Sequence, residues 1–406
     1  MNTIVMKFGG TSVANVDRIR NVANIIENKF KQGSNNIVVV VSAMAGVTND
    51  LIEKSKSISK NFSNDEYDVL LSSGEQVTSA LLSGALIEKG LKARSMLGWQ
   101  IPIVTEGQHK NSRIISVNSE AIQNVLSAGN IVVVPGFQGI SDSMKISTIG
   151  RGGSDASAVA LAKALDAERC EIYTDVEGVF TTDPGMCKEA KKIEKISYDE
   201  MLEMASLGAK VMQSTSVQKA MINDVEIFVK SSFAPEKSGT QITSDKKISY
   251  NKVVTGVAYS KDDAKVTLKN VKDKPGVASA IFEPLTNQNI VVDMIVQNIS
   301  ADNKKTDVTF TIKREDLEKT KSLMESLKSN IEYEEILTNA SVSKVSIVGA
   351  GMITHPGVAF KMFNTLASNG INILVISTSE IKISVLVDDN NTSAAVQNLH
   401  SVFNLN

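Results

Sequence analysis

The first 245 residues alternate short apolar runs, rich in valine and isoleucine, with stretches long enough to form helices. The short runs are almost continuously apolar, which is typical of parallel strands buried on both faces of a sheet. This pattern predicts an α/β domain with a mostly parallel sheet. The predicted strands are residues 3–7, 36–42, 93–97, 130–135, 170–174 and 226–230, and the predicted helices are residues 16–31, 65–90, 119–127, 154–165 and 198–220. Ser197 and Glu200 form a predicted capping box for the last helix.

The rest of the chain contains an internal repeat. After Gly239 the predicted segments become shorter and denser in strands, and the sequence PGVA at 275–278 recurs 81 residues later at 356–359. The same spacing pairs Phe282 with Phe363, Leu285 with Leu366 and Ile290 with Ile371. Each copy passes from a strand through a helix into another strand, so we expect two small units of the ββα type with a common origin.

The composition excludes several classes of protein. The net charge of −2 gives no reason to expect nucleic acid or an anionic membrane as a partner, and apolar runs such as 131–134 are far shorter than a membrane span. Two cysteines, Cys170 and Cys187, are too few for a disulfide framework or a zinc site. The first residues lack the charged start, apolar core and cleavage site of a secretory signal. We therefore expect a cytoplasmic protein.

Small residues follow several of the predicted strands, at the sheet edge where α/β domains bind ligands. The clusters are residues 9–10, 42–46, 135–136 and 150–155. Glycine lets backbone N–H groups approach an anion, and Gly152, Gly153 and Ser154 open a predicted helix whose N-terminus attracts negative charge. Lys7 adds a cation beside the first cluster. No Gly-Lys dipeptide occurs, which excludes a Walker A loop, yet the clusters together indicate a bound phosphate.

Six motifs of the first part and three of the repeat occur in the order typical of one family. They are KFGGTSV (7–13), VVSAMAGVTN (40–49), SSGEQ (72–76), GRGGSD (150–155), YTDVEGV (173–179) and ASLGAKV (205–211), followed by KDKPG, DMIVQN and STSEI. Together they resemble the motifs of aspartate kinases with tandem ACT domains. The resemblance implies a three-layer αβα amino acid kinase fold with a mostly parallel sheet, followed by two α+β, ferredoxin-like ACT units.

In this family the first ACT unit is inserted within the second. The resemblance therefore implies a catalytic domain at residues 1–245, a linker with the first strand of the second ACT unit at 246–262, the inserted ACT unit at 263–338 and the second ACT unit at 339–406.

The resemblance also implies a reaction, in which the γ-phosphoryl group of ATP moves to the side-chain carboxylate of L-aspartate. The product, 4-phospho-L-aspartate, begins the biosynthesis of lysine, threonine and methionine. A carboxylate with a pKa of about 3.9 is already ionised at pH 7, so the reaction needs no general base. His109, His355 and His400 lie outside the shared motifs, which fits such a reaction. Positioning and cationic stabilisation remain for the protein to supply.

By match to the family, residue roles follow. Lys7 and Lys210 hold the phosphates, and Asp155 orients these lysines. Glu75 suits the ammonium of aspartate, and Arg151 suits a carboxylate through its two-donor fork. Further ATP contacts come from Gly9, Gly10, Ser42, Thr174, Asp175, Phe180 and Asp183, and further substrate contacts from Thr48, Gly152, Gly153 and Ser154.

The resemblance implies that the protein itself holds no metal, since Mg²⁺ is carried by ATP. Phe180 and Gly185 stand where the family usually has tyrosine and arginine, which bears on nucleotide affinity.

ACT units of this type pair across a dimer and bind amino acids at the shared edge. The resemblance thus implies a homo-oligomer that is inhibited by lysine, threonine or both. The matching effector residues are Asp273, Gly276, Ala278, Gln297 and Asn298 in the first unit, and Val358, Ala359, Asn372, Ile373, Ser379 and Glu380 in the second. The alternative is that both units serve only for dimerisation, with these polar residues facing water.

Two alternative functions are compatible with parts of the sequence. A kinase for glutamate or N-acetylglutamate would not be expected to combine GRGGSD with this ACT pair. A catalytically silent amino-acid sensor would not need an intact set of pocket residues, and the chain retains Lys7, Glu75, Arg151, Asp155 and Lys210. Because the sequence ends at Asn406, we also expect a monofunctional enzyme rather than a fusion with homoserine dehydrogenase.

Overall fold

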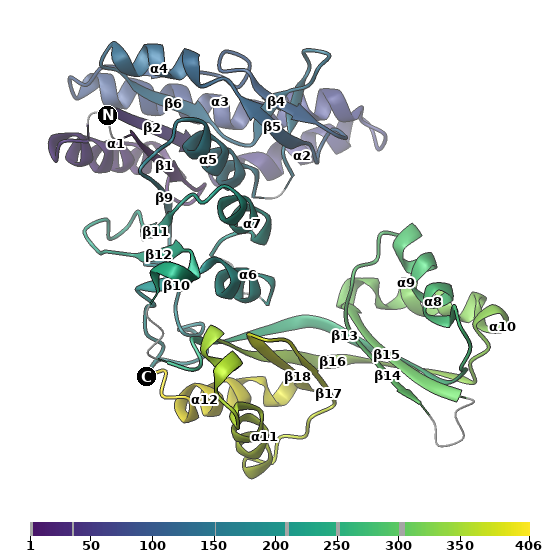
Figure 1. Ribbon diagram of the computed structural model, residues 1–406. Coiled ribbons are helices and arrows are strands. Elements are labelled where there is room, and N and C mark those ends of the chain that lie inside the picture. The colour runs from purple at the N-terminus through teal and green to yellow at the C-terminus, as the bar shows by residue number, and fades with distance from the viewer. Residues whose placement is uncertain (1–2, 35, 151, 208–210, 249–251, 300–304) are drawn as a thin grey trace. The chain divides into compact units, whose positions relative to one another are not determined.

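The structure, a computed structural model, describes all of the chain except residues 1–2, 35, 151, 208–210, 249–251 and 300–304 (Figure 1). The chain forms two compact units. The first consists of Met1–Val179, Lys192–Ser206 and Lys210–Ser249, and the second consists of Phe180–Lys191, Leu207–Ala209 and Tyr250–Asn406. Phe180–Lys191 therefore lies between two parts of the first unit in sequence but belongs to the second unit.

The first unit contains two sheets. The larger has the strand order β10-β12-β11-β9-β1-β2-β6-β3, and its neighbours pair in parallel except β11 and β12. Its strands are β1 (Thr3–Phe8), β2 (Asn36–Val41), β3 (Ala93–Ser95), β6 (Ile131–Pro135), β9 (Arg169–Thr174), β10 (Lys195–Ser197), β11 (Ile227–Ser231) and β12 (Thr240–Thr243). The smaller sheet, of order β5-β4-β7-β8, contains β4 (Ile103–Glu106), β5 (Arg113–Val117), β7 (Gln138–Ile140) and β8 (Ile146–Thr148). The helices are α1 (Val16–Lys31), α2 (Val47–Ile58), α3 (Asn64–Glu88), α4 (Ser119–Ser127), α5 (Gly153–Ala164), α6 (Tyr198–Ser206), α7 (Ser214–Ile222) and η1 (Asp245–Lys247).

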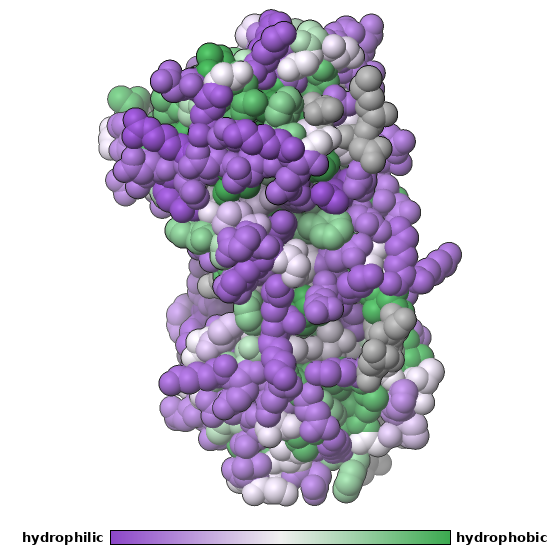
Figure 2. All heavy atoms as spheres, turned by 90° about the vertical axis from the view of Figure 1, so that its left-hand side faces the viewer, coloured by the Kyte–Doolittle hydropathy of each residue, from purple (hydrophilic) through white to green (hydrophobic). Residues whose placement is uncertain are grey.

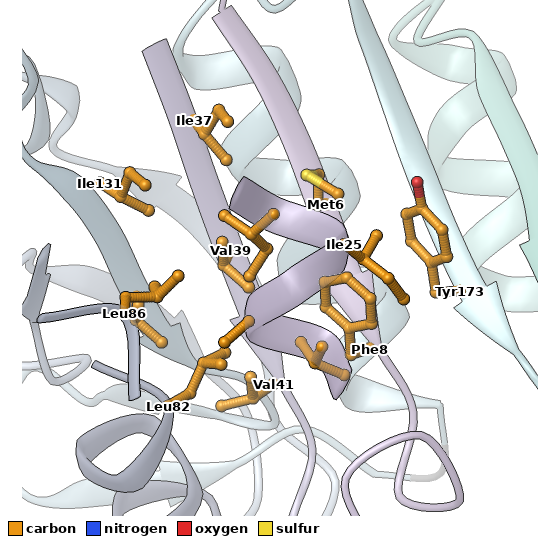
Figure 3. Packing of buried hydrophobic residues seen from close by; sticks show 14 of the residues in the cluster. Met6, Phe8, Ile25, Ile37, Val39, Val41, Leu82, Leu86, Ile131 and Tyr173 are labelled. Atoms are coloured by element: carbon orange, nitrogen blue, oxygen red, sulfur yellow. The ribbon is translucent and has the colours of Figure 1, made fainter. Parts of the chain in front are cut away.

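The larger sheet is covered on both faces because its central strands are apolar at almost every position. β1 directs Ile4, Met6 and Phe8 to one face, where they pack with side chains of α1 and α3 (Figure 3). Phe8 also stacks on Tyr173 of β9, with 4.7 Å between the ring centroids. On the opposite face, α5 covers β1, β2 and β9. These three layers confirm the predicted αβα fold with its mostly parallel sheet.

Most predicted elements of the first unit are confirmed, and α1 and α4 have the predicted bounds. The single helix predicted over 198–220 is wrong, since α6 and α7 are separate helices. The helix α7 starts anew at Ser214 because Gln213 has an extended backbone, with φ of −76° and ψ of 135°. The capping box before α6 is confirmed. Glu200 N donates to Ser197 Oγ over 3.1 Å, and Ser197 N donates to Glu200 Oε2 over 3.2 Å.

The sequence patterns did not predict α2 or the smaller sheet. The strands of that sheet have only three to five residues, too few for their periodicity to stand out. Both features nevertheless position the functional residues. The helix α2 begins directly after Gly46, and β8 leads into the glycine-rich segment that starts at Gly150.

The second unit contains an antiparallel sheet of order β14-β15-β13-β16-β18-β17. Its strands are β13 (Gly256–Lys272), β14 (Val292–Ile299), β15 (Lys305–Lys313), β16 (Glu335–Val348), β17 (Val375–Thr378) and β18 (Lys382–Asp388). Its helices are α8 (Val277–Asn287), α9 (Leu317–Ser326), α10 (Lys328–Ile331), α11 (Val358–Ser368) and α12 (Thr392–Val402), with short turns η2 (Arg314–Asp316), η3 (Ala350–Thr354) and η4 (Asp389–Asn391). The predicted α+β architecture is thus confirmed. The domain ranges predicted from the sequence remain a proposal, and β13 runs across the proposed boundary between residues 262 and 263.

The internal repeat is visible in the fold of the second unit. Gly276 precedes α8 and Gly357 precedes α11, and both have left-handed backbones, with φ of 93° and 90°. The buried positions of the two helices keep the spacing of 81 residues. They are Val277, Ile281 and Leu285 in α8, and Val358, Met362 and Leu366 in α11. The two copies therefore bury equivalent faces of equivalent helices.

The surface in Figure 2 is mainly hydrophilic, with smaller hydrophobic patches between the polar side chains. Within the described residues, we find no helix with both the length and the apolar character needed to span a membrane.

Candidate active site

A cavity of about 760 Å³ opens at the carboxyl ends of β1 and β2 in the first unit. This is the edge at which open α/β sheets bind ligands. Its walls come from the segments after β1 and β2, from α3, from the end of β8 and from the start of α5. Of the residues predicted from the sequence, the cavity brings together Lys7, Gly10, Ser42, Thr48, Glu75, Gly152, Gly153, Ser154 and Asp155.

Lys7 and Asp155 form an ion pair in this cavity, with 2.6 Å between Nζ and Oδ1. Lys7 lies two residues after Val5 on β1, so its side chain leaves the sheet on the face that α5 covers. Asp155 lies in the first turn of α5. Their side chains are only 11% and 10% exposed. The pair therefore presents a lysine of fixed position, which is the kind of group that stabilises a transferring phosphoryl group.

The start of α5 requires glycine at Gly152. Its φ of 74° lies in the left-handed region, and a Cβ atom at this position would lie 2.3 Å from Cγ of Gln213. With glycine here, the backbone can reverse tightly and direct the N-terminus of α5 into the cavity. A helix N-terminus offers N–H groups and a positive potential to an anion.

Glu75 is a buried carboxyl group in the wall of the cavity. It is 4% exposed, and burial raises its pKa to about 7, although hydrogen bonds from the backbone of Ala43 and of Glu75 itself partly offset the effect. Its Oε2 has no hydrogen-bond partner among the described residues. A ligand cation would meet an unused acceptor here, and its charge would lower the pKa again.

Asp68 and the segment after β4 were not predicted as part of the site. Asp68 of α3 is fully buried and accepts hydrogen bonds from Nδ1 of His109 (2.6 Å), from the backbone N–H of Lys110 and from both the N–H and the hydroxyl of Thr148. Lys110 and Thr148 line the cavity. His109 thus helps to position the wall of the cavity. No motif marks these residues, because Asp68 contacts groups 41 to 80 positions away in the sequence.

Other predicted site residues lie elsewhere. Gly9 follows β1, and its N–H donates to the carbonyl of Tyr173, but it does not line the cavity. Thr174 and Asp175, at the end of β9, bond to each other through Thr174 Oγ1 and Asp175 Oδ1 (3.0 Å) and also do not line it. Phe180 and Asp183 belong to the second unit, where the hydroxyl of Tyr259 donates to Asp183 Oδ2. Arg151 and Lys210 fall outside the described residues.

The predicted effector residues occupy equivalent places in the two repeat copies. In the first copy Asp273, Gly276, Ala278, Gln297 and Asn298 lie around the start of α8 and along β14, and all are exposed. In the second copy the residues lie around the start of α11 and on either side of β17, namely Val358, Ala359, Asn372, Ile373, Ser379 and Glu380. Val358 is buried in the core, so it could meet a ligand only through its backbone.

Family models match both parts of the chain. The model of the amino acid kinase family matches residues 2–231. The model of an ACT domain matches twice, at residues 268–326 and 345–403.

Relatives match the chain over its full length. An aspartate kinase of Stutzerimonas stutzeri is 47% identical and aspartokinase 2 of Bacillus subtilis is 46% identical, and each alignment covers 100% of this chain and 98% of the relative. The crystal structure of Escherichia coli aspartokinase III with aspartate and ADP, described as an R-state, is 27% identical with a TM-score of 0.79. The T-state of that enzyme with lysine and aspartate is 26% identical with a TM-score of 0.78. Each of these two comparisons covers 99% of both chains.

Proposed function

The chain belongs to the amino acid kinase family and, within it, to the aspartate kinases, and from this we propose how its pocket carries out the reaction. The reaction transfers the γ-phosphoryl group of ATP to the side-chain carboxylate of L-aspartate, giving 4-phospho-L-aspartate and ADP. This is the first step toward lysine, threonine and methionine. The relative with a known complex binds aspartate and ADP, the substrate and product that this reaction requires.

One observation carries the assignment of the pocket, namely the buried ion pair of Lys7 and Asp155 at the N-terminus of α5. We propose that Lys7 contacts the phosphates and that Asp155 holds its ammonium in place. In the step itself, a carboxylate oxygen of aspartate forms a bond to the γ-phosphorus, and the bond from that phosphorus to the bridging oxygen of ADP breaks. No proton leaves the nucleophile. The protein therefore needs to bring two anions together and to offset their charge.

A different set of pocket residues is assigned to the recognition of aspartate. We propose that Glu75 binds the substrate ammonium, since its Oε2 has no partner in the described part of the chain and a cation bound there would lower its pKa of about 7 and favour the ionised carboxylate. Thr48 and Ser154 line the same cavity and can add hydroxyl contacts. Arg151 remains the proposed carboxylate ligand on the basis of the motif alone.

The pocket also fits Mg²⁺ that arrives with the nucleotide. Mg²⁺ in kinase sites is commonly bound by phosphate oxygens together with one or two carboxylates and water. Asp155 supplies a carboxylate in the pocket, whereas the described residues contain no group of three or more His, Cys, Asp and Glu side chains arranged to hold a metal. We propose that Mg²⁺ is bound with ATP, where its charge offsets that of the phosphates.

Steady-state kinetics with ATP, Mg²⁺ and candidate acceptors tests this proposal. We expect saturable ADP release with L-aspartate, and no turnover above background with L-glutamate or N-acetyl-L-glutamate. ADP release should also vanish when Mg²⁺ is replaced by EDTA. Turnover with glutamate equal to that with aspartate would contradict the substrate assignment, and full activity in EDTA would contradict the role of Mg²⁺.

We further propose that the ACT pair forms a homo-oligomeric interface and binds lysine, threonine or both. The T-state complex of the Escherichia coli relative contains lysine. In this chain, the exposed amide of Gln297 on β14 can both donate to and accept from an amino acid, and Asp273 can bind an ammonium. Coupling between such sites and a catalytic site is typically about 1–3 kcal/mol, or roughly 5- to 150-fold in affinity.

Inhibition by the end products should therefore be measurable. We expect lysine, threonine or their mixture to lower the rate at subsaturating aspartate, and Gln297→Ala to weaken this inhibition without changing the uninhibited rate. Gln288→Ala, which changes a glutamine at the end of α8 outside the proposed effector residues, is the matched control. Flat titrations of the wild type with both amino acids would rule out the effector role, and equal inhibition of both variants would place the effector away from Gln297.

A further inference from the structure

The segment between β4 and β5 is built into the wall of the pocket. Asp68 holds it from behind through His109 Nδ1 and the N–H of Lys110, and Ser112 N donates to the carbonyl of Thr148 over 3.0 Å. On its other side the segment packs tightly against Gly150, where a Cβ atom would lie 2.4 Å from Oδ1 of Asn111. Contacts on both sides fix the backbone at Lys110.

The backbone of Lys110 is strained. Its φ is 72°, a conformation that costs a residue with a side chain roughly 1 kcal/mol or more and that glycine adopts freely. Strained residues of this kind cluster at binding sites, where the surrounding structure holds them. Here the full burial of Asp68 and its hydrogen bonds supply that support. A lysine at this position therefore calls for an explanation in terms of its side chain.

The side chain of Lys110 brings a positive charge to the pocket. Its Nζ lies 4.2 Å from the ring centroid of Tyr67, and both residues line the cavity. Of the two lysines that line the cavity in the described part of the chain, Lys7 is paired with Asp155, whereas Lys110 forms no ion pair there. Its ammonium is thus held by an aromatic face and remains available to an anion.

Lys110 lines the cavity together with residues that are assigned to the amino-acid substrate. Tyr67, Leu71 and Glu75 recur every four residues on α3 and line the cavity in one row about 12 Å long. Lys110 lies at the Tyr67 end of this row, and Glu75, the proposed ammonium ligand, lies at the other. The segment that carries Lys110 also packs on β8 and Gly150, next to the glycines assigned to aspartate.

We propose that Lys110 is a further substrate-binding residue, whose ammonium attracts and binds a carboxylate of the amino-acid substrate, and that Asp68 is the positioning residue that holds Lys110 in place. This inference rests on the proposed function. It explains why a lysine occupies a left-handed position that glycine would fill without strain.

Three variants of Lys110 test the charge separately from the fold. Lys110→Gly removes the side chain and relieves the strained φ, and Lys110→Met keeps the stem over Tyr67 without the charge. Both should raise KM for aspartate about 3- to 10-fold, with KM for ATP changed less than twofold, while Lys110→Arg stays near the wild type. The melting temperature of Lys110→Gly should equal or exceed that of the wild type. Met144→Gly, at another exposed left-handed position (φ 60°) outside the cavity, controls for the backbone change and should leave both KM values unchanged.

A double-mutant cycle tests the role of Asp68. If Asp68 acts through Lys110, Asp68→Asn should raise KM for aspartate in the wild-type background and have much less effect in Lys110→Met. Equal effects in both backgrounds would overturn the positioning role. An unchanged KM for aspartate in Lys110→Met, or an equal rise in KM for ATP, would overturn the role of Lys110. A wild type that does not phosphorylate aspartate would instead overturn the proposed function itself.

Discussion

Replacement of Lys7 by methionine should lower kcat for phosphoryl transfer about 100- to 1,000-fold. The reason is the position of its ammonium, which is held 2.6 Å from Asp155 at the edge where β1 meets the N-terminus of α5. Removal of one preorganised charge that stabilises a transition state typically costs two to three orders of magnitude in rate. Single-turnover measurements at saturating ATP and aspartate isolate this step from binding. A fall of less than about fivefold would exclude a catalytic role for Lys7.

The matched control for this experiment is Lys29→Met. Lys29 of α1 pairs with Glu171 at 2.8 Å, and these side chains are 14% and 3% exposed, close to the values of 11% and 10% for Lys7 and Asp155. Both substitutions remove a largely buried ammonium from an ion pair. Lys7→Met leaves Asp155 without an ion-pair partner among the described residues, which typically costs about 3–5 kcal/mol of stability, whereas Glu171 keeps its ion pair with Arg169 Nε at 3.0 Å after Lys29→Met. Lys29 does not line the cavity. A measured loss of stability in both variants, with activity lost only in Lys7→Met, would separate catalysis from folding.

Replacement of Glu75 by glutamine should reduce kcat/KM for aspartate about 100-fold or more. Glutamine keeps the shape of the side chain but cannot offset the charge of the substrate ammonium, and loss of one partner of a buried charge pair typically costs about 2–5 kcal/mol. The effect should fall on KM for aspartate rather than on KM for ATP. A change of less than fivefold in kcat/KM would show that another group binds the ammonium.

The pH dependence gives Glu75 a distinct signature. Because the pKa of Glu75 is raised to about 7, kcat/KM of the wild type for aspartate should rise as the carboxyl ionises between about pH 6 and 8, and this rise should be absent in Glu75→Gln.

The free energy of unfolding of the wild type should instead fall as the pH rises. A carboxyl whose folded pKa exceeds its unfolded value destabilises the fold increasingly above pH 4.5, with the full penalty above pH 7. At pH 8, chemical denaturation should therefore show Glu75→Gln to be more stable than the wild type by roughly 1–3 kcal/mol.

Sequence patterns predicted the parts of the site that lie at strand ends and helix starts. Lys7 and Asp155 are far apart in the chain, but each lies beside a local pattern. Lys7 ends an apolar run that forms β1, and Asp155 follows the glycines at the start of α5. The mostly parallel sheet of an α/β domain could be predicted because its central strands are apolar on both faces, whereas the three-layer αβα arrangement was implied by the family resemblance. The repeat could be predicted because Gly276 and Gly357 must adopt the same left-handed turn before equivalent helices.

The other features of the fold and of the candidate site could not be predicted, because they depend on contacts between residues far apart in the sequence. Asp68 occupies a helical position that would be equally compatible with water, and its role follows only from the distant His109, Lys110 and Thr148 that donate to it. The break between α6 and α7 was missed because both segments have helical periodicity. Thr174 and Asp175 were matched to the nucleotide by family motif, yet they do not line the cavity, so their role stays a prediction.

The long strands β13 and β16 run through both repeat copies, so that the first copy lies between two parts of the second in the sequence. Ser260 of β13 pairs with Lys344 of β16, and Asp263 pairs with Val342. The chain therefore enters the first repeat copy on β13 and leaves it on the neighbouring β16, and the two strands are about 4.8 Å apart. A segment whose two ends are this close can enter or leave a hairpin without displacing the strands that flank it. Such an arrangement allows a gene to acquire the inner copy by insertion. Loss of residues 339–406 would instead leave Gly256–Ser260 without Lys344–Val348, the stretch of β16 that pairs with it.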